Sequence, residues 1–317
     1  MRIKNRRSFI IGLKSTKLNK SEVTFLKKYK PWGVILFQRN INSINQVCNL
    51  TTNIKKIFKD KNYPILIDQE GGKVDRLKRI IDTSFFTSEF FGKLYKKDIK
   101  KFKIYYKIFI KQTSYLLNKI GVNINTVPVL DVRNSSGAKI IGSRSFGSNQ
   151  KLVAKIGNFC ISEFHNNNIG TVIKHIPGHG LARIDSHKDT PIVKQNLKKL
   201  SKIDFYPFKN QKSIFAMTAH IIYSKIDKFN TATHSKKMIS LIRENIKYKN
   251  LIISDDISMK SLKFSLKNNT INAFNAGCNL VLHCNGKLAE MTIVAKNSPI
   301  IDNFIIKKTS QFYKILR

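Results

Sequence analysis

Acidic residues are scarce in this chain. Its 317 residues contain 58 Lys and Arg but only 19 Asp and Glu, which gives a formal net charge of +39 at pH 7. A basic excess of this size is typical of proteins that bind nucleic acid or another anionic surface. The basic residues are spread through the chain without forming a tail, and Lys, Asn, Ile and Phe, whose codons are rich in A and T, are abundant together. We therefore attribute most of the charge to genome composition and keep a non-catalytic binder of anionic polymer as an alternative.

Cysteine is also rare, and no apolar run is long. The four cysteines stand far apart with no C-x-x-C pair, which argues against zinc ribbons and redox motifs and favours core cysteines in a reducing compartment. No apolar run could span a bilayer, and the basic N-terminal stretch has too short an apolar core for a signal peptide. We expect a soluble, cytoplasmic monomer whose partners include neither a membrane nor a specific nucleic acid.

Short apolar runs alternate with segments of helical periodicity along the whole chain. Such alternation predicts parallel strand pairing, and eight repeats predict a single-domain (β/α)₈ barrel over residues 1–317. A doubly wound open sheet is the competitor, but the turn Gly12-Leu13-Lys14 after the first strand is not a Gly-rich phosphate turn. The expected strands are 9–13, 32–37, 63–67, 122–129, 170–173, 214–218, 251–254 and 279–282.

The helices are expected from apolar stripes at helical spacing and from capping residues. Asn19 and Glu22 have capping-box spacing, and Gly277 is placed to end a helix. The expected helices are 20–29, 44–57, 93–120, 153–164, 197–208, 238–246, 259–276 and one within 288–316.

The segment 93–120 is both basic and aromatic. Ile104, Tyr105, Ile108 and Phe109 are spaced to share one helix face, with lysines on the other side. A helix that binds nucleic acid or a membrane is one interpretation. We favour an outer barrel helix with a solvated lysine face, because lysine stems cover apolar surface while their heads stay in water.

Polar residues stand at the ends of the expected strands. Barrel enzymes build their active sites from side chains at the carboxyl ends of the strands, so these residues are expected to face one rim. They are Arg39, Asp68, Asp131, Lys174, His175, His220, Asp255 and His283.

One long loop follows the fifth expected strand, within residues 172–193. It carries His179, Asp185 and His187 beyond Lys174 and His175. Long loops in compact domains are commonly functional. Asp185 could fix the tautomer of His187 for general acid–base work, although an isolated D-x-H can also be a surface turn. A metal site of His175, His179, Asp185 and His187 is the rival interpretation.

Other charged side chains suit a nucleophile and substrate contacts. Asp255 follows a buried strand and could act as a nucleophile or an electrostatic stabiliser, or it could simply cap the following helix. Arg76 and Arg144 can make forked hydrogen bonds to a hydroxyl-rich or anionic ligand, and Asp68 can accept from two sugar hydroxyls. Gly71-Gly72 lets the backbone turn close to the site.

These residues together resemble a known family. The stretch from Lys174 to Gly180 (Lys-His-Ile-Pro-Gly-His-Gly) followed by Asp185-Ser186-His187 looks like the signature of the bacterial NagZ-type β-N-acetylglucosaminidases of glycoside hydrolase family 3. The resemblance runs nearly end to end, and its other blocks are Leu36–Asn40, Asp68–Gly72, Pro128–Val132, Gly142–Phe146, Ala219–Tyr223 and Ser254–Met259.

The resemblance implies a fold, a reaction and a set of roles. It implies a single-domain barrel without a metal or cofactor, and a retaining mechanism with Asp255 as nucleophile and His187, held by Asp185, as general acid/base. Asp68, Arg76, Arg144, Lys174 and His175 match the sugar-contacting positions of the family. The implied substrate is non-reducing β-linked N-acetylglucosamine on cytoplasmic peptidoglycan turnover fragments, chiefly N-acetylglucosaminyl-anhydro-N-acetylmuramyl peptides. The two alternatives from other classes are a metal-dependent hydrolase and the binder of anionic polymer.

Overall fold

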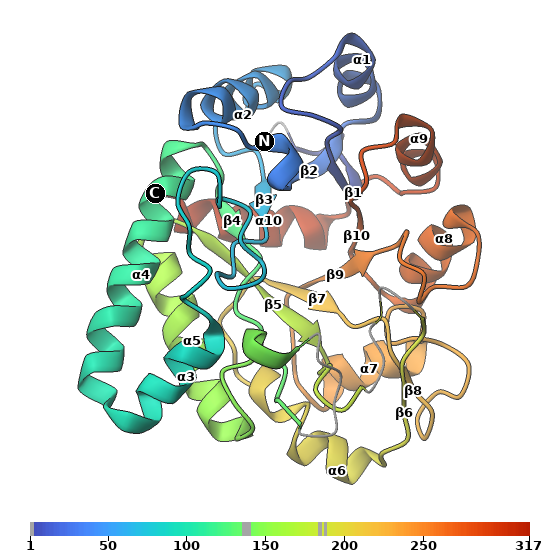
Figure 1. Ribbon diagram of the computed structural model, residues 1–317. Coiled ribbons are helices and arrows are strands. Elements are labelled where there is room, and N and C mark those ends of the chain that lie inside the picture. The colour runs from blue at the N-terminus through green and yellow to red at the C-terminus, as the bar shows by residue number, and fades with distance from the viewer. Residues whose placement is uncertain (1–2, 135–140, 183–185, 187–188) are drawn as a thin grey trace.

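Eight parallel strands close into a barrel in a computed structural model that describes residues 3–134, 141–182, 186 and 189–317. The strand order around the barrel is β1-β10-β9-β7-β5-β4-β3-β2, and every pairing is parallel (Figure 1). The prediction of a (β/α)₈ barrel is therefore confirmed. The barrel strands are β1 (Arg7–Gly12), β2 (Pro31–Leu36), β3 (Ile65–Ile67), β4 (Ile124–Asn125), β5 (Gly170–Ile176), β7 (Phe215–Thr218), β9 (Leu251–Asp256) and β10 (Leu280–His283).

Each barrel strand lies in an apolar run that the sequence singled out, but the lengths differ. The strand β4 keeps only two residues of the expected 122–129, and Pro128, which has no N–H to donate, follows it. The strand β5 runs on to Ile176 and so includes Lys174 and His175. Two further strands, β6 (Ile192–Val193) and β8 (Ile222–Tyr223), pair in a small separate sheet that the sequence did not predict, since two residues carry no periodicity.

The helices alternate with the strands, and several expected helices are divided or shortened. Asp98 caps the N-terminus of α4 by accepting a hydrogen bond from the backbone N–H of Lys101, so the expected helix 93–120 is two helices. Ser265 caps α8, which starts later than predicted. The helices are α1 (Lys20–Tyr29), α2 (Ile44–Phe58), α3 (Ser88–Lys97), α4 (Ile99–Lys119), α5 (Gln150–Asn166), α6 (Leu197–Lys202), α7 (Lys236–Glu244), α8 (Leu266–Ala276), α9 (Leu288–Lys296) and α10 (Asn303–Ile315).

Both predicted helix caps, at the start of α1 and at the end of α8, are confirmed. Asn19 and Glu22 form a reciprocal capping box at the start of α1, with side-chain to backbone distances of 2.8 and 3.0 Å. Gly277 ends α8 at φ +111°, a left-handed conformation that favours glycine. The expected helix 197–208 is α6 followed by the 3₁₀ turn η3 (Tyr206–Phe208), and the last expected helix is the pair α9 and α10.

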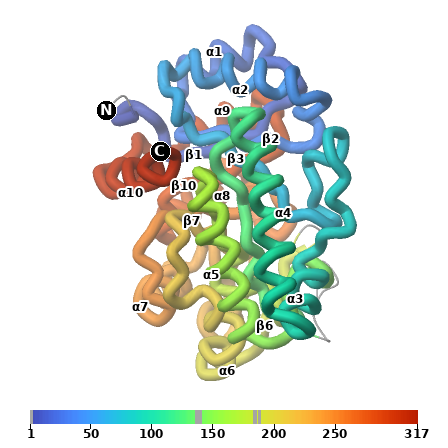
Figure 2. The backbone as a smooth tube through the Cα atoms, turned by 90° about the vertical axis from the view of Figure 1, so that its left-hand side faces the viewer, coloured from blue at the N-terminus to red at the C-terminus, as the bar shows by residue number. Residues whose placement is uncertain are grey.

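The orientation of α4 differs from the prediction. Ile104, Tyr105 and Ile108 were expected to face inward but are exposed, and the buried face consists instead of Phe102, Tyr106, Ile110, Thr113, Ser114 and Leu117. Both faces of this helix carry large apolar residues, so helical spacing alone did not reveal which one packs against the barrel. In Figure 2, α4 and α5 run side by side along the barrel wall.

Alternation along the strands separates two layers of core. The inward residues, such as Ile10, Leu66 and Val172, fill the barrel, whereas their neighbours in sequence pack against the surrounding helices. The helix α10 lies behind the strands in Figure 1 and closes one end of the barrel. There the indole of Trp32 donates to Thr309 of α10 at 2.9 Å, and the barrel side chains pack against Phe312. The other end, where the strands finish, is the mouth of the barrel.

Candidate active site

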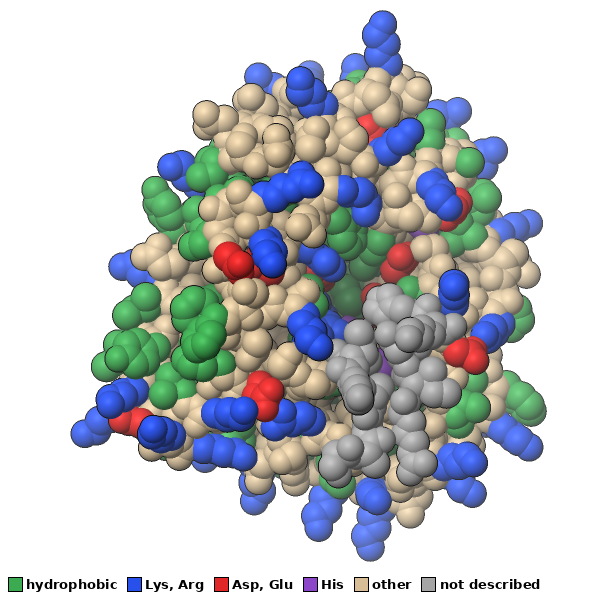
Figure 3. Space-filling view, in the orientation of Figure 1, with side chains coloured by type: hydrophobic (Ala, Val, Ile, Leu, Met, Phe, Trp, Pro, Cys, Tyr) green, Lys and Arg blue, Asp and Glu red, His purple; other side chains and the backbone are tan. Residues whose placement is uncertain are grey.

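The inward alternation continues from apolar to polar residues at the carboxyl ends of the strands. Asp68 follows Leu66 by two residues, Lys174 follows Val172, and Asp255 follows Ile253, so each polar side chain belongs to the inward-facing set of its strand. Figure 3 shows a hollow at the centre of this face with acidic and basic side chains beside it. The barrel therefore has an apolar interior with a charged layer at its mouth.

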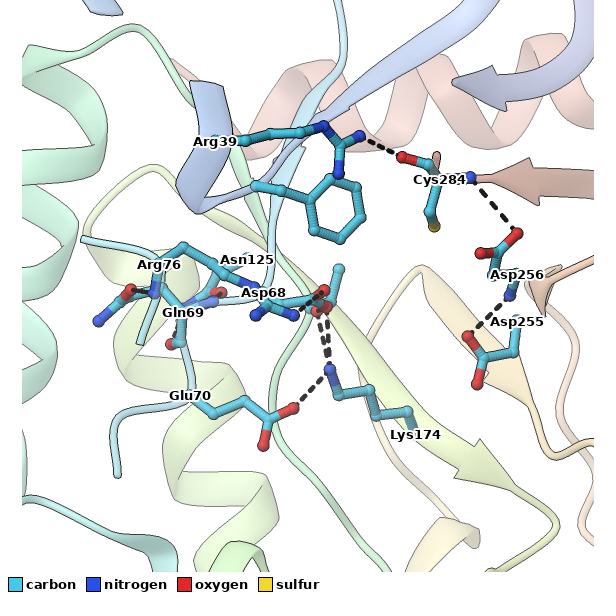
Figure 4. Close-up of polar contacts among 12 residues, drawn as sticks. Arg39, Asp68, Gln69, Glu70, Arg76, Asn125, Lys174, Asp255, Asp256 and Cys284 are labelled. Carbon is cyan, nitrogen blue, oxygen red and sulfur yellow. Dashed lines mark hydrogen bonds and ion pairs between the residues drawn. The ribbon is translucent and has the colours of Figure 1, made fainter. Parts of the chain in front are cut away.

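Lys174 forms the centre of a buried charge network. Its Nζ atom lies 3.1 Å from Oδ1 of Asp68 and 2.7 Å from Oε1 of Glu70, and it donates to Thr126 at 3.0 Å (Figure 4). Burial alone would lower the pKa of Lys174, but the two carboxylates raise it above its ordinary value. Burial alone would raise the pKa of Asp68, and the adjacent cations, Lys174 foremost, hold it well below its usual range.

Arg144 completes the network from the other side of Glu70. Its Nε and Nη2 atoms each lie 2.8 Å from a carboxylate oxygen of Glu70, which is a forked, charge-assisted pair. Burial would raise the pKa of Glu70, but Arg144 and Lys174 lower it to about 2. Two carboxylates and two cations are thus held in their charged forms beside the barrel mouth.

Arg76 lies at the edge of the same network. Its Nη2 atom is 3.4 Å from Oδ2 of Asp68, and its guanidinium lies 5.4 Å from the ring centre of Phe37. Arg39 stacks on the same ring at 4.7 Å and donates to the carbonyl oxygens of Leu13 and Cys284. The two guanidinium groups thus share one aromatic ring at the edge of the site.

His175 is held by Asp131. The Nδ1 atom of His175 lies 2.7 Å from Oδ2 of Asp131, and Oδ1 of Asp131 accepts from the backbone N–H groups of His175 and His179 at 3.2 and 2.7 Å. Asp131 is completely buried; burial would raise its pKa, but His175 and the hydrogen bonds lower it. Asp131 therefore holds the ring of His175 in one orientation, with Nδ1 directed at the carboxylate.

Asp255 lies across the mouth from Lys174 (Figure 4). It accepts a hydrogen bond from the backbone N–H of Asp256 at 2.8 Å, and it is half-buried. Burial would raise the pKa of Asp255, but His220, His175 and the backbone N–H lower it, so the carboxylate is ionised. It caps no helix, because α8 starts only at Leu266 and the turn after β9 is held by Asp256, which accepts from the N–H and the hydroxyl of Ser258.

Another buried carboxylate, Asp204, lies under the start of the long loop. Asp204 is 1% exposed, and within the described residues neither of its oxygens has a hydrogen-bond partner. Gly178 packs on it so closely that a Cβ would lie 2.7 Å from the Asp204 Cβ, and the hydroxyl of Tyr223 donates to the Gly178 carbonyl. Burial raises the pKa of Asp204 to about 7.

Two sequence-predicted site residues, Asp185 and His187, lie outside the described residues. Ser186 between them is described, and its hydroxyl is 3.4 Å from Nε2 of His179. The metal site that the sequence suggested as an alternative needs both residues, so it remains a hypothesis. Among the residues that the structure does describe, no three His, Cys, Asp or Glu are grouped to hold a metal ion.

The structure brings Asp68, Arg76, Arg144 and Lys174 into one network, with His175 next in sequence on β5. Sequence reasoning assigned no role to Glu70, which joins Arg144 to Lys174. A signal for it existed: two cations expected at a barrel mouth need buried carboxylates as partners, and Glu70 is two residues beyond Asp68.

The remaining predicted rim residues are held by structural contacts. His220 contacts Thr233 at 2.7 Å and the Asp256 carbonyl at 3.0 Å, and His283 contacts Glu290 at 3.1 Å. Each of these histidines therefore uses at least one ring nitrogen in a contact within the protein.

Comparison with known proteins agrees with this architecture. Residues 7–310 match the model of the glycosyl hydrolase family 3 N-terminal domain. The β-hexosaminidase of Haemophilus ducreyi is 31% identical over 289 residues, which is 87% of this chain and 80% of that protein. β-Hexosaminidase A of Pseudoalteromonas piscicida is 31% identical over 281 residues, and there the match spans 81% of this chain but only 46% of the relative.

Solved structures show the same likeness. NagZ of Neisseria gonorrhoeae, crystallised with N-trifluoroacetyl-D-glucosamine, superposes with a TM-score of 0.87 at 25% identity and covers 99% of this chain and 90% of its own. A barrel with a charged mouth and these matches define a glycoside hydrolase. The chain belongs to glycosyl hydrolase family 3.

Proposed function

We propose that the chain is a retaining exo-β-N-acetylglucosaminidase that acts in the cytoplasm on peptidoglycan turnover fragments, namely N-acetylglucosaminyl-anhydro-N-acetylmuramyl peptides. The observation that carries the proposal is the ionised carboxylate of Asp255, which lies at the barrel mouth opposite the Lys174 network. An ionised, half-buried carboxylate without a helix to cap is suited to attack an anomeric carbon. The proposed active unit is a monomer with one catalytic domain over residues 1–317.

The proposed reaction has two steps. In the first, Asp255 bonds to the anomeric carbon while the bond from that carbon to the leaving oxygen breaks, and His187 gives its proton to that oxygen. In the second, His187 takes a proton from water, the water oxygen bonds to the anomeric carbon, and the bond to Asp255 breaks. The proposed role of Asp185 is to orient His187. The roles of Asp185 and His187 rest on the sequence motif alone.

Asp68, Arg76, Arg144, Lys174 and His175 are proposed to hold the sugar. Oδ1 of Asp68 accepts from Lys174 and Thr126, which leaves Oδ2, 3.4 Å from Arg76, to accept from a sugar hydroxyl. Arg144 uses Nε and Nη2 for Glu70, and its Nη1 is proposed to donate to the sugar. Carboxylate partners, namely Asp68, Glu70 and Asp131, hold the basic groups of this set before substrate arrives, which lowers the entropic cost of binding.

The preference for an N-acetyl sugar is supported by kinship. The curated relatives are named β-hexosaminidases, and the N. gonorrhoeae structure contains an N-acylated glucosamine. The peptidoglycan fragment and the cytoplasmic setting are carried over from the family signature around Lys174–Gly180. None of the helices in the described ranges combines the length and hydropathy needed to cross a bilayer.

The first test is chromophore release from an aryl β-N-acetylglucosaminide, measured with and without EDTA. We expect release that EDTA does not change, with retained anomeric configuration in the first-formed sugar by NMR. Loss of activity with EDTA and its return with Zn²⁺ would instead support the metal-dependent hydrolase. Release from an aryl β-glucoside at an equal rate would contradict the preference for an N-acetyl sugar.

A further inference from the structure

The outer face of α4 exposes an unusual number of large apolar side chains. Ile104 is 57% exposed, Ile108 is 52% exposed and Tyr115 is 59% exposed. Positions 104, 108 and 115 are separated by four and seven residues, so they form a single stripe along the helix. The stripe points away from the barrel, because the opposite side of α4 is buried. A contiguous exposed apolar patch commonly marks an interaction site.

The same face is basic and has no acidic residue of its own. The sequence of α4 contains six lysines and no Asp or Glu. Lys111 falls within the apolar stripe, and the exposed Lys100 and Lys101 flank it by helical spacing. Of the nearby acids, Glu163 is 3.8 Å from Lys107, and Glu89 of α3 is paired with Lys93 and Arg133. The face therefore has a local positive charge beside its apolar stripe.

An apolar pocket of about 450 Å³ extends this surface toward the loop before α3. Its lining includes the apolar residues Ile81, Phe86, Tyr105 and Ile108. Asp82, from the loop before α3, also lines it. The neighbouring Phe85 is 69% exposed and packs edge-on against Phe86. Ile108 of the helix stripe and Phe86 of the loop line the same pocket, so the stripe and the loop form one continuous surface. Figure 3 shows apolar side chains gathered on this side of the molecule.

We propose that this surface docks the protein on a bilayer that contains anionic lipids. We call it the α4 face and define it by Lys100, Lys101, Ile104, Ile108, Lys111 and Tyr115, together with the loop residues Phe85 and Phe86. Apolar and aromatic side chains that alternate with lysines are the composition of helices that lie in the membrane interface. The aliphatic and aromatic groups enter the headgroup boundary, and the lysine stems extend so that their ammonium groups reach lipid phosphates.

Other occupants fit this surface less well. A nucleic-acid backbone would engage the lysines but would give Ile104 and Ile108 no apolar partner. A second copy of the chain would bring one basic face against another, at a net charge of +39 for each copy. An anionic bilayer satisfies both the charge and the apolar stripe.

Because α4 runs along the barrel wall, docking would lay the barrel axis along the membrane, with the mouth open to the side (Figure 2). The proposal is independent of the assigned reaction.

The test uses a tryptophan placed on the α4 face of the full chain. The chain has a single tryptophan, Trp32, which is fully buried, so Tyr115→Trp adds one exposed reporter over a constant background. We expect a blue shift of emission and co-sedimentation with vesicles of phosphatidylglycerol and phosphatidylcholine, and neither effect with phosphatidylcholine alone. An absence of binding to the anionic vesicles at low salt would overturn the proposal.

Matched charge variants separate the α4 face from the general charge of the chain. Lys100→Gln, Lys101→Gln and Lys111→Gln together should weaken vesicle partitioning about a hundredfold, since a lysine near an anionic surface contributes roughly fivefold. The control replaces Lys20, Lys27 and Lys28 of α1 with Gln, which removes the same charge from exposed positions elsewhere. Equal weakening by the two triple variants would overturn the proposal, because it would show that charge alone drives binding.

A third variant tests the apolar component. Ile104→Ser with Ile108→Ser leaves the charge unchanged and should reduce vesicle partitioning at least tenfold, while thermal unfolding and duplex DNA binding stay as in the parent chain. Parent-like partitioning of this variant would contradict the proposal. DNA binding that falls with it would assign the face to nucleic acid instead.

Discussion

Arg144 holds Glu70 through two parallel hydrogen bonds of 2.8 Å, and the carboxylate of Glu70 is almost completely shielded from water. The second partner of Glu70, Lys174, reaches it from strand β5, whereas Arg144 comes from the 3₁₀ turn η2 (Gly142–Arg144). This ion pair therefore ties a loop of the rim to the barrel itself. Removing Arg144 would leave the buried charge of Glu70 with one of its two cations.

Arg144→Met should destabilise the fold by about 3 kcal/mol, because it leaves Glu70 with Lys174 as its single cation. The measurement is urea unfolding at pH 7. The control is Arg133→Met, which removes a more exposed pair with Glu89 and should cost less than about 1 kcal/mol. Equal costs for the two variants would contradict the assigned importance of burial.

Acid should remove stability that depends on Asp68 and Glu70. Their pKa values are lower in the folded chain than in the unfolded chain, so the free energy they contribute is present above about pH 4.5 and is lost as pH falls toward 2. Lys174→Met should shift this loss to higher pH, because it removes the cation that both carboxylates share. Denaturation profiles between pH 2 and 7 would measure it, and superimposable profiles would contradict the network.

Asp204 should act in the opposite direction. The folded chain keeps its proton up to about pH 7, whereas the unfolded chain releases it near pH ~4, so the free energy of unfolding falls as pH rises between these values. Full ionisation costs up to roughly 4 kcal/mol. Asp204→Asn should remove this loss, so the variant gains stability relative to the parent as pH rises from 4 to 8. The exposed Glu244→Gln serves as a control and should leave the pH dependence unchanged.

If Asp255 is the nucleophile, as proposed above, Asp255→Asn should reduce turnover by roughly 10⁴-fold. The neighbouring Asp256→Asn should have a much smaller effect, because Asp256 accepts from Ser258 in the turn. Turnover is measured with the aryl substrate, and azide added to Asp255→Ala should yield a glycosyl azide of inverted configuration. Near-normal activity of Asp255→Asn would contradict its role.

The sequence predicted the repeated strand–helix units of the barrel and the polar residues at the strand ends. Alternation in Leu66–Asp68 and Ile253–Asp255 indicated both a buried strand and an inward polar residue, and the structure has both. The partners of the charges were less visible, because the Glu70–Arg144 contact joins residues 74 positions apart and no local pattern records it. The orientation of α4 was predicted wrongly, since Ile104 and Phe102 belong to two equally apolar stripes and only packing decides between them.

The closed end of the barrel has a consequence for the order of product release in the proposed reaction. Among the described residues, Trp32, Phe215 and Phe312 fill that end, so the proposed reaction uses the mouth for both entry and exit. If the sugar binds deepest, the aglycone must dissociate before the sugar does. Under the proposed function, free N-acetylglucosamine would then occupy the position that the next substrate needs and would compete with it directly. Such an enzyme slows as its own sugar product accumulates, whichever aglycone it releases.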